Sequence, residues 1–411
     1  MTETPRRRFQ PSSRGDRLMR PLQEFLETST AGAVVLLAAA IVALVWANSA
    51  WSAGYERAWT TPFTLGVGRL SVRHDLRFFI DDAGMALFFL VVGLEIKREL
   101  VIGELRDRRA AALPAIAALG GMIVPALIYV GLTQHTAGPR GWGIPMATDI
   151  AFALGVLTLA ARHAPPSLKP FLLTMAIVDD IGSVVVIAIF YSSGVSWAWL
   201  GAGVATVSAI ALLRRVGAGG PVVFAALAAG LWFAAYRAGI HPAITGVLVG
   251  LLTPVESFPH AHRHDRHGRP LTRLEHLLLP WTTFLIAPLF ALANAGVRLE
   301  GSVGRIAVAV VVARLAGKIA GIAGATWLAV RAGVGRLPSG ARWSHMVGVA
   351  ALGGMGFTVA LLVTSLSFAD PALVASAKTG IIISAVVAGV LGWTLLRLAP
   401  RVTPADDAVD L

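Results

Sequence analysis

About twelve apolar segments, each close to the ~20 residues that a helix needs to cross a bilayer, follow one another along the chain. Hydrophobic residues make up 56% of the 411 residues and charged residues only 14%, too little polar surface for a soluble protein. The sequence therefore predicts an all-α polytopic membrane protein. The approximate segments are 31–48, 79–96, 110–133, 142–161, 169–192, 196–213, 220–237, 240–254, 275–296, 303–330, 343–367 and 372–397.

Positive charge is placed asymmetrically between these segments. The formal net charge is +12, and most lysines and arginines stand at the ends of apolar runs rather than among aromatic residues. This placement is typical of membrane orientation and does not favour nucleic-acid binding. An even number of spans then puts both termini in the cytoplasm. The first outer loop is an exception, with Arg57, Arg69, Arg73 and Arg77.

The apolar segments delimit one membrane domain at 31–398, between a cytoplasmic N-terminal segment at 1–30 and a cytoplasmic tail at 399–411. The first run is long enough to span and is predicted to be an uncleaved helix rather than a signal peptide. The absence of cysteine excludes disulfide bonds and thiolate metal or redox sites.

The outer loop at about 61–73 alternates apolar and polar residues, as a small β-hairpin between the first two helices would. A lone hairpin is marginal in water, so this one is expected to pair with a second copy in a homodimer. An irregular surface loop fits the composition equally well. The residues that would form the dimer contact are Gly66, Gly68, Leu70 and Val72.

Two adjacent carboxylates, Asp179 and Asp180, lie in the middle of the fifth segment. Each would cost at least ~2.5 kcal/mol at the centre of a bilayer, and the two like charges repel each other. At least one is therefore expected to bind a proton reversibly. Apolar residues flank the pair on both sides, which disfavours a solvated helix end. We interpret the pair as a functional site.

Two other segments contain residues that interrupt a helix. The fourth carries Thr148 and Asp149 shortly after a proline, and the eleventh carries Gly353, Gly354 and Gly356. The segments at about 110–192 and 303–397 thus form two similar trios, each with an interrupted central member. Such paired interruptions in inverted repeats point to the binding site of a transporter. A kinked helix with a capping Asp, and glycines at close helix contacts, are simpler alternatives.

Lys318 lies near the middle of the tenth segment, where its ammonium group needs a carboxylate partner. Asp149, Asp179 and Asp180 are the candidates. Arg314, one turn earlier, is expected to extend to the membrane interface instead. Asp81 and Asp82, near the outer end of the second segment, are expected to be solvated.

Further charged residues cluster where the second segment ends and the ninth begins, on the predicted cytoplasmic side. They fit either a titratable cluster or ordinary charged helix ends. The loop at 255–274 is rich in histidine, and a flexible loop is a simpler interpretation of it than a metal site. The residues of the cluster are Glu95, Arg98, Glu99, Glu275 and His276.

Taken together and in order, these motifs resemble the NhaA-type sodium/proton antiporters from about residue 20 to 398. The matching stretches are FFLVVGLEIKREL at 88–100, ATDIAFALGVL at 147–157, VDDIG at 178–182, RLEH at 273–276, LFALANAGV at 289–297 and GMGFT at 354–358. The resemblance implies twelve helices in the bacterial inner membrane, with two broken helices (segments 4 and 11) that cross at mid-membrane. It also implies a dimer joined by the outer hairpin.

The resemblance also implies roles for individual residues. Asp180 would be the principal cation-binding carboxylate and Asp179 its neighbour, while Lys318 would pair with Asp179 when sodium is absent. Thr148 and Asp149 would lie beside the crossing. The cytoplasmic cluster, together with Asp265 of the loop, would regulate transport by pH.

The chain departs from the family pattern where the ninth helix begins. Thr272 stands at the first position of a basic pair, and Leu279 replaces a second histidine. Transport chemistry is unaffected by these changes, but the pH of activation can differ.

The expected function is electrogenic, pH-regulated exchange of cytoplasmic Na⁺ or Li⁺ for external H⁺, with no enzymatic activity and no cofactor. Cation and protons would compete for Asp179 and Asp180, with Lys318 as an alternative source of one proton. Asp149 and Lys318 would also compensate the partial charges of helix ends that face each other at the crossing. An intramembrane aspartyl protease would not need Lys318, and a light-driven pump would have its lysine in the last of about seven helices.

Overall fold

The computed structural model describes residues 14–67, 70–160, 164–192, 194, 196–216, 220–255, 270–298 and 304–400. Helices make up almost all of the regular structure there, and the strands pair in one antiparallel hairpin. Up to residue 216 the elements are α1 (Arg14–Ala47), α2 (Ser52–Thr60), β1 (Pro62–Val67), β2 (Leu70–Asp75), α3 (Leu76–Phe79), η1 (Ile80–Gly84), α4 (Met85–Val101), η2 (Glu104–Arg106), α5 (Arg108–Thr133), η3 (Pro139–Gly143), α6 (Ile150–Ala160), α7 (Leu168–Phe190) and α8 (Trp197–Val216).

The remaining elements complete the helical bundle. They are α9 (Pro221–Ala238), α10 (Ala243–Leu252), α11 (Pro270–Trp281), η4 (Thr282–Ile286), α12 (Ala287–Asn294), α13 (Arg305–Val312), η5 (Ala313–Gly317), α14 (Lys318–Arg331), α15 (Trp343–Gly353), α16 (Thr358–Ser367) and α17 (Pro371–Leu398).

Seven helices of the described residues are long and apolar enough to cross a membrane, or up to nine if each of two bent pairs forms one span. The bent pairs are α1 with α2, at 115°, and α15 with α16, at 48°. Helices α6 and α10 are apolar but shorter than a span. The chain is therefore a multi-pass helical membrane protein. Twelve spans stay a prediction, because several apolar segments form short or broken helices.

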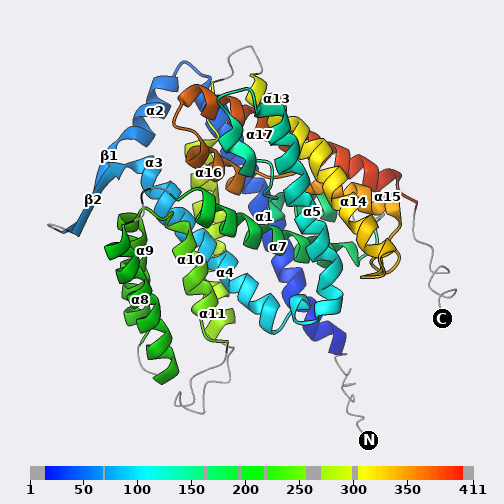
Figure 1. Ribbon diagram of the computed structural model, residues 1–411, viewed down its shortest axis with the longest axis horizontal. Helices are drawn as coiled ribbons and strands as arrows, with labels where there is room; N and C mark the ends of the chain where they lie inside the picture. Colours follow the sequence, from blue (N-terminus) through cyan, green and yellow to red (C-terminus); the bar gives the residue numbers. More distant parts are fainter. Residues whose placement is uncertain are drawn as a thin grey trace, which may run out of the picture.

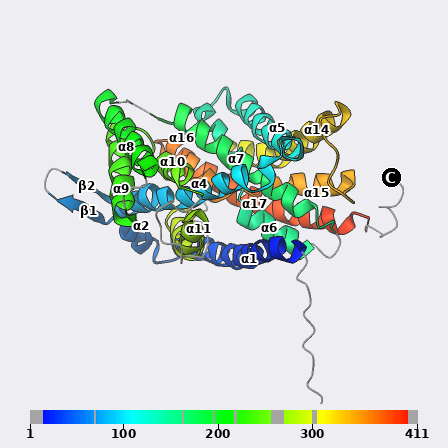
Figure 2. The ribbon, with the colours of Figure 1, turned by 90° about the horizontal axis from the view of Figure 1, so that it is seen from below.

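Helix α7 runs through the middle of the bundle (Figures 1 and 2). It packs against α5, which in turn packs against α14, while α13 and α15 both pack against α17. On another side, α1 contacts α6 and α12, and α4 lies along α10. Helices α8 and α9 pack against each other at the edge of the bundle (Figure 1). Broken helices and α7 therefore lie inside a shell of longer helices.

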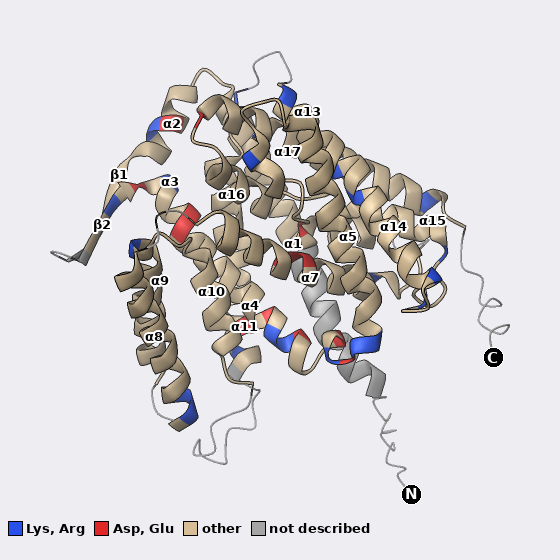
Figure 3. Ribbon diagram, in the orientation of Figure 1, with Lys and Arg blue, Asp and Glu red and all other residues tan. Residues whose placement is uncertain are grey.

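The outer surface of the bundle is apolar, as a lipid-facing surface requires. Large hydrophobic side chains such as Val45, Leu127, Leu212 and Val390 are exposed on it. Lysine and arginine stand mostly near helix ends, whereas some acidic residues lie in the middle of the bundle near α7 (Figure 3). Charge inside the bundle is thus concentrated in a few places.

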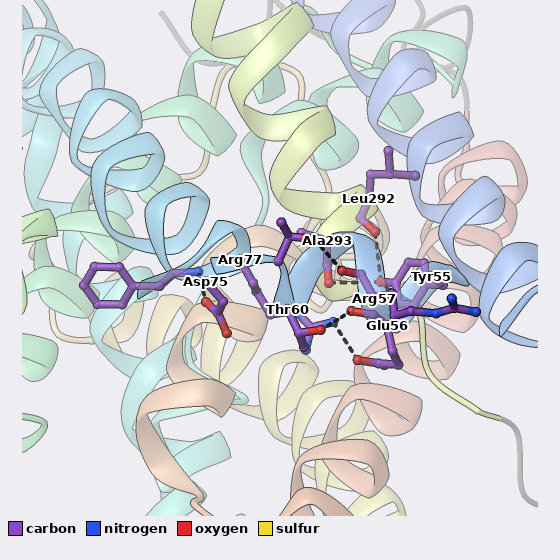
Figure 4. Close-up of polar contacts among 11 residues, drawn as sticks. Tyr55, Glu56, Arg57, Thr60, Asp75, Arg77, Leu292 and Ala293 are labelled. Carbon is purple, nitrogen blue, oxygen red and sulfur yellow. Dashed lines mark hydrogen bonds and ion pairs between the residues drawn. The ribbon is translucent and has the colours of Figure 1, made fainter. Parts of the chain in front are cut away.

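The predicted outer hairpin is present. Strands β1 and β2 are antiparallel, with Leu65 opposite Val72 and Val67 opposite Leu70. Residues 68 and 69, which include the predicted Gly68, lie outside the described residues. The base of the hairpin is fixed to the bundle through α2. The Tyr55 hydroxyl lies 2.9 Å from the carbonyl oxygens of both Leu292 and Ala293 (Figure 4).

Candidate functional site

The two predicted helix interruptions lie against each other. The first break, residues 147–149, precedes α6, and the second break, residues 354–357, separates α15 from α16. The Asp149 amide donates to the Met355 carbonyl at 2.6 Å, and the Thr148 hydroxyl donates to the Gly353 carbonyl at 2.9 Å. Each break therefore satisfies backbone groups that the other leaves without a helical partner.

Asp149 binds the N-termini of two helices. Its carboxylate accepts from the Phe152 amide of α6 at 3.3 Å, and from the amide and hydroxyl of Thr358 on α16 at 3.4 and 3.1 Å. A negative charge at these positions offsets the partial positive charge of both helix ends. Asp149 thus joins α6 to α16 across the breaks.

Lys318 and Asp179 form a buried ion pair at the breaks. The Lys318 ammonium lies 3.0 Å from Asp179 Oδ2, and the two side chains are 1% and 2% exposed. Thr148 completes the contact: its hydroxyl accepts from Lys318 at 3.0 Å, and its amide donates to Asp179 at 2.8 Å. The structure thus brings together three of the residues predicted to form the site.

Asp180 is also buried, but it does not take part in the ion pair between Lys318 and Asp179. Among the described residues, no group donates a hydrogen bond to its carboxylate, and it borders a cavity of about 110 Å³. Asp149, Thr148 and Thr358 line the same cavity at the breaks, and Glu95 of α4 lines it as well. Asp180 therefore presents free carboxylate oxygens to a space that also reaches Glu95.

The charged residues of α4 and α11 meet as the sequence suggested. Arg98 forms ion pairs with Glu275 and, at 3.4 Å, with Glu99. Glu99 also accepts from the Glu104 amide at 3.0 Å. His276 is exposed, and Asp265 lies outside the described residues. The pairing joins α4 to α11 close to the residue, Glu95, that lines the cavity.

The sequence-based placement of Arg314 was wrong. The side chain is fully buried, and instead of reaching the interface it lies at the breaks, with its Nε 3.3 Å from the Gly354 carbonyl and its Nη2 3.1 Å from the Ala147 carbonyl. Lys318 was expected to compensate the partial negative charge of carbonyl groups at this crossing, and Arg314 binds them instead. The spacing to Lys318 was an available signal, because residues four apart share a helix face.

Asp82 is likewise buried rather than solvated. It lies 3.4 Å from His241, and its neighbour Asp81 accepts from Asn294 at 2.5 Å. These contacts connect η1 to the start of α10 and to α12. No local pattern in the sequence pairs these three segments.

Comparison with known proteins identifies relatives over almost the whole chain. Residues 23–396 match the profile of the family described as Na+/H+ antiporter 1. A protein named Na(+)/H(+) antiporter NhaA from Anaeromyxobacter sp. is 41% identical over 432 residues, which cover 96% of this chain and 94% of the relative. A relative with the same name from Citrobacter koseri is 41% identical over 396 residues, covering 93% of this chain and 100% of the relative. Na(+)/H(+) antiporter NhaA 3 from Frankia alni is 42% identical over 423 residues, with coverages of 94% and 91%.

Proposed function

Because the chain belongs to the Na+/H+ antiporter 1 family, we propose that it exchanges cytoplasmic Na⁺ or Li⁺ for external H⁺ across the bacterial inner membrane, for sodium and pH homeostasis. The observation that carries this proposal is the free Asp180 carboxylate beside the cavity. A small alkali cation without its water shell binds hard oxygen ligands, and a carboxylate that no other group occupies supplies them.

The cation site contains Asp180, Asp179 and the Thr148 hydroxyl. No group of three or more His, Cys, Asp or Glu side chains in the described part of the chain is arranged around one metal position. The remaining ligands are therefore backbone carbonyls of the breaks or water. Such a mixed oxygen shell binds weakly enough for release, which a transporter needs.

Protons and the cation compete for this site. Na⁺ binding at Asp180 draws the neighbouring Asp179 away from Lys318, because the ammonium and the cation repel each other. Lys318 then releases one proton. The second proton leaves Asp180, where Na⁺ takes its place. The 3.0 Å contact favours Lys318 over Asp179 as the second proton source, since a carboxylate paired with an ammonium is already ionised. Two protons for one Na⁺ move net charge, so transport is electrogenic.

The cavity is the cytoplasmic access route, and the Arg98–Glu275 pair regulates it. Glu95 is buried next to this pair and lines the cavity, so charge in the cluster acts on ions that enter. Protonation of the cluster at low cytoplasmic pH would repel the cation and slow exchange. With Glu99, and with His276 and Asp265 as further members, this cluster sets the pH dependence.

Access to the site at the paired breaks alternates between the two sides of the membrane during the exchange. Segments 110–192 and 303–397 form inverted repeats whose interrupted helices cross at the site, and rocking of these repeats alternates access. The outer hairpin joins two protomers through its strands β1 and β2. Val72, which was predicted to lie in the contact, is instead buried in its own protomer. The side chains of Phe63 and Leu65 on β1 support this contact, because they are apolar and exposed, and a second protomer would cover them.

The proposal is tested in everted membrane vesicles from a bacterium that lacks its own antiporters. Respiration forms a proton gradient, a pH-sensitive dye reports it, and Na⁺ or Li⁺ is then added. Wild-type protein should dissipate the gradient, whereas Asp180→Asn should not. Asp370→Asn is the matched control, because Asp370 is exposed at the start of α17. Lack of dissipation by wild type with either ion from about pH 6 to 9 would refute exchange.

A further inference from the structure

Arg314 is a second buried cation beside the ion site, and the mechanism above gives it no role. It stands four residues before Lys318, in the π-helical turn η5, and is among the largest fully buried side chains. No carboxylate of the described residues lies within ion-pair distance of it. A buried guanidinium is retained only where it is paired or hydrogen-bonded, so its acceptors indicate its role.

Both acceptors are carbonyl groups of the two breaks. Ala147 belongs to the first break and Gly354 to the second, and Arg314 reaches one with Nη2 and the other with Nε. The planar guanidinium carries donors in a fixed fork, which allows a single side chain to bind two carbonyls at once. Arg314 therefore connects the breaks from their carbonyl side, while Asp149 connects them from their amide side.

The packing around this fork is tight. A Cβ atom added at Gly356 would collide with Arg314 Nη2 and with the Ala147 carbonyl oxygen. The backbone of the second break can approach the guanidinium this closely only because residue 356 has no side chain. Gly356 therefore leaves the space that the Arg314 guanidinium occupies at the second break.

We propose that Arg314 is a positioning residue of the cation site: its guanidinium holds the carbonyl groups of both breaks, which leaves Lys318 free to pair with Asp179. The inference rests on the proposed exchange. Lys318 contacts Asp179 and Thr148, whereas both carbonyls are taken by Arg314. A guanidinium keeps its charge throughout the cycle, so it can hold the breaks while the ammonium gives up its proton.

The charge of Arg314 also acts on the ion site. The ionisable groups that interact with its charge are Lys318, four residues later in the chain, Asp149 before α6 and Asp179 on α7. A permanent positive charge beside these groups opposes the binding of positive ions, and two protons leave for each Na⁺ that binds, so it weakens proton binding more than cation binding. Its removal should make protons harder to displace, so that exchange begins at higher pH.

The test compares Arg314→Gln, Arg314→Lys and the control Arg305→Gln, which changes an exposed arginine at the start of α13. In vesicles, Arg314→Gln should shift the midpoint of the exchange–pH profile to alkaline pH by at least about half a unit. Arg314→Lys keeps the charge and should restore the midpoint, although it should melt at a lower temperature because an ammonium is a single point that lacks the planar fork with which Nε and Nη2 reach the two carbonyls. Arg305→Gln should match wild type in both measurements.

Two results would overturn the proposal. One is an exchange–pH midpoint for Arg314→Gln that equals the wild-type midpoint. This would mean that the charge of Arg314 does not act on the ion site. The other is wild-type melting in both Arg314 variants, which would mean that the two carbonyl contacts hold nothing in place. If Arg314→Gln does not fold, the Arg314→Lys melting temperature and midpoint decide the question. A wild type without exchange would refute the proposed function, and the melting comparison would still test the contacts.

Discussion

The Lys318–Asp179 pair makes a stability prediction that can be worked out from its geometry. At 3.0 Å and an effective dielectric constant of about 20, the attraction is about 5 kcal/mol, and desolvation offsets part of it. Lys318→Met keeps the apolar stem but leaves Asp179 buried without its partner. Breaking a buried pair from one side costs about 3–5 kcal/mol, so the variant should be destabilised by that amount.

A double variant separates the pair from the packing around it. Lys318→Met with Asp179→Asn removes both charges, and the asparagine oxygen can still accept from the Thr148 amide. Replacing both partners of a buried pair is often nearly neutral, so the double variant should recover at least half of the loss.

The assay is thermal unfolding of purified protein in detergent at one heating rate. By the size scaling of unfolding entropy, roughly 1–2 °C per kcal/mol is expected for a chain of this length, so Lys318→Met should melt roughly 3–10 °C lower. The same melting temperature in wild type and Lys318→Met would refute the reasoning. So would a double variant no more stable than Lys318→Met, since the loss would then come from packing.

Three further predictions concern other parts of the chain. Gly356→Ala should lower both the melting temperature and the exchange rate because its Cβ collides with its neighbours, whereas Gly324→Ala on α14, where the space is open, should change neither. Arg98→Gln removes the partner of Glu275 and should move the pH profile of exchange to alkaline values with little change in the maximal rate, measured in vesicles. Shortening the hairpin at 62–75 should reduce the cross-linked dimer on gels while exchange persists; an unchanged dimer fraction would place the contact elsewhere.

The sequence predicted those features in which a residue type conflicts with its surroundings. The clearest examples are adjacent aspartates in an apolar run and a mid-span lysine, which need charged or polar partners that an ordinary membrane helix does not offer. A glycine cluster is another, because the helix it interrupts leaves backbone groups that need partners. The structure places Lys318 against Asp179 and brings the two interruptions into contact. The hairpin followed from alternation of polar and apolar residues, a pattern that depends on local sequence alone.

Features that depend on rotation and bending of helices could not be read in this way. Arg314 was predicted to extend to the membrane interface, but the direction of its side chain is set by the π-helical turn η5 and by its contacts with the two breaks. The 115° bend between α1 and α2, and the pairing of Asp82 with His241, depend on contacts between segments far apart in sequence.

The contacts divide the buried charges at the breaks into two groups. Asp149 and Arg314 are bound to backbone amides and carbonyls, so their charge is needed in every state in which the breaks keep their shape. Lys318 contacts Asp179 and the Thr148 hydroxyl, and Asp180 borders the cavity, so these two can change partners without freeing a backbone group. Asp179 pairs with Lys318 but also accepts from the Thr148 amide, so it belongs to both groups. Apart from Asp179, structural and exchangeable charges are therefore separate side chains, and the exchange of one cation for protons does not have to disturb the contacts of Asp149 and Arg314 that hold the breaks.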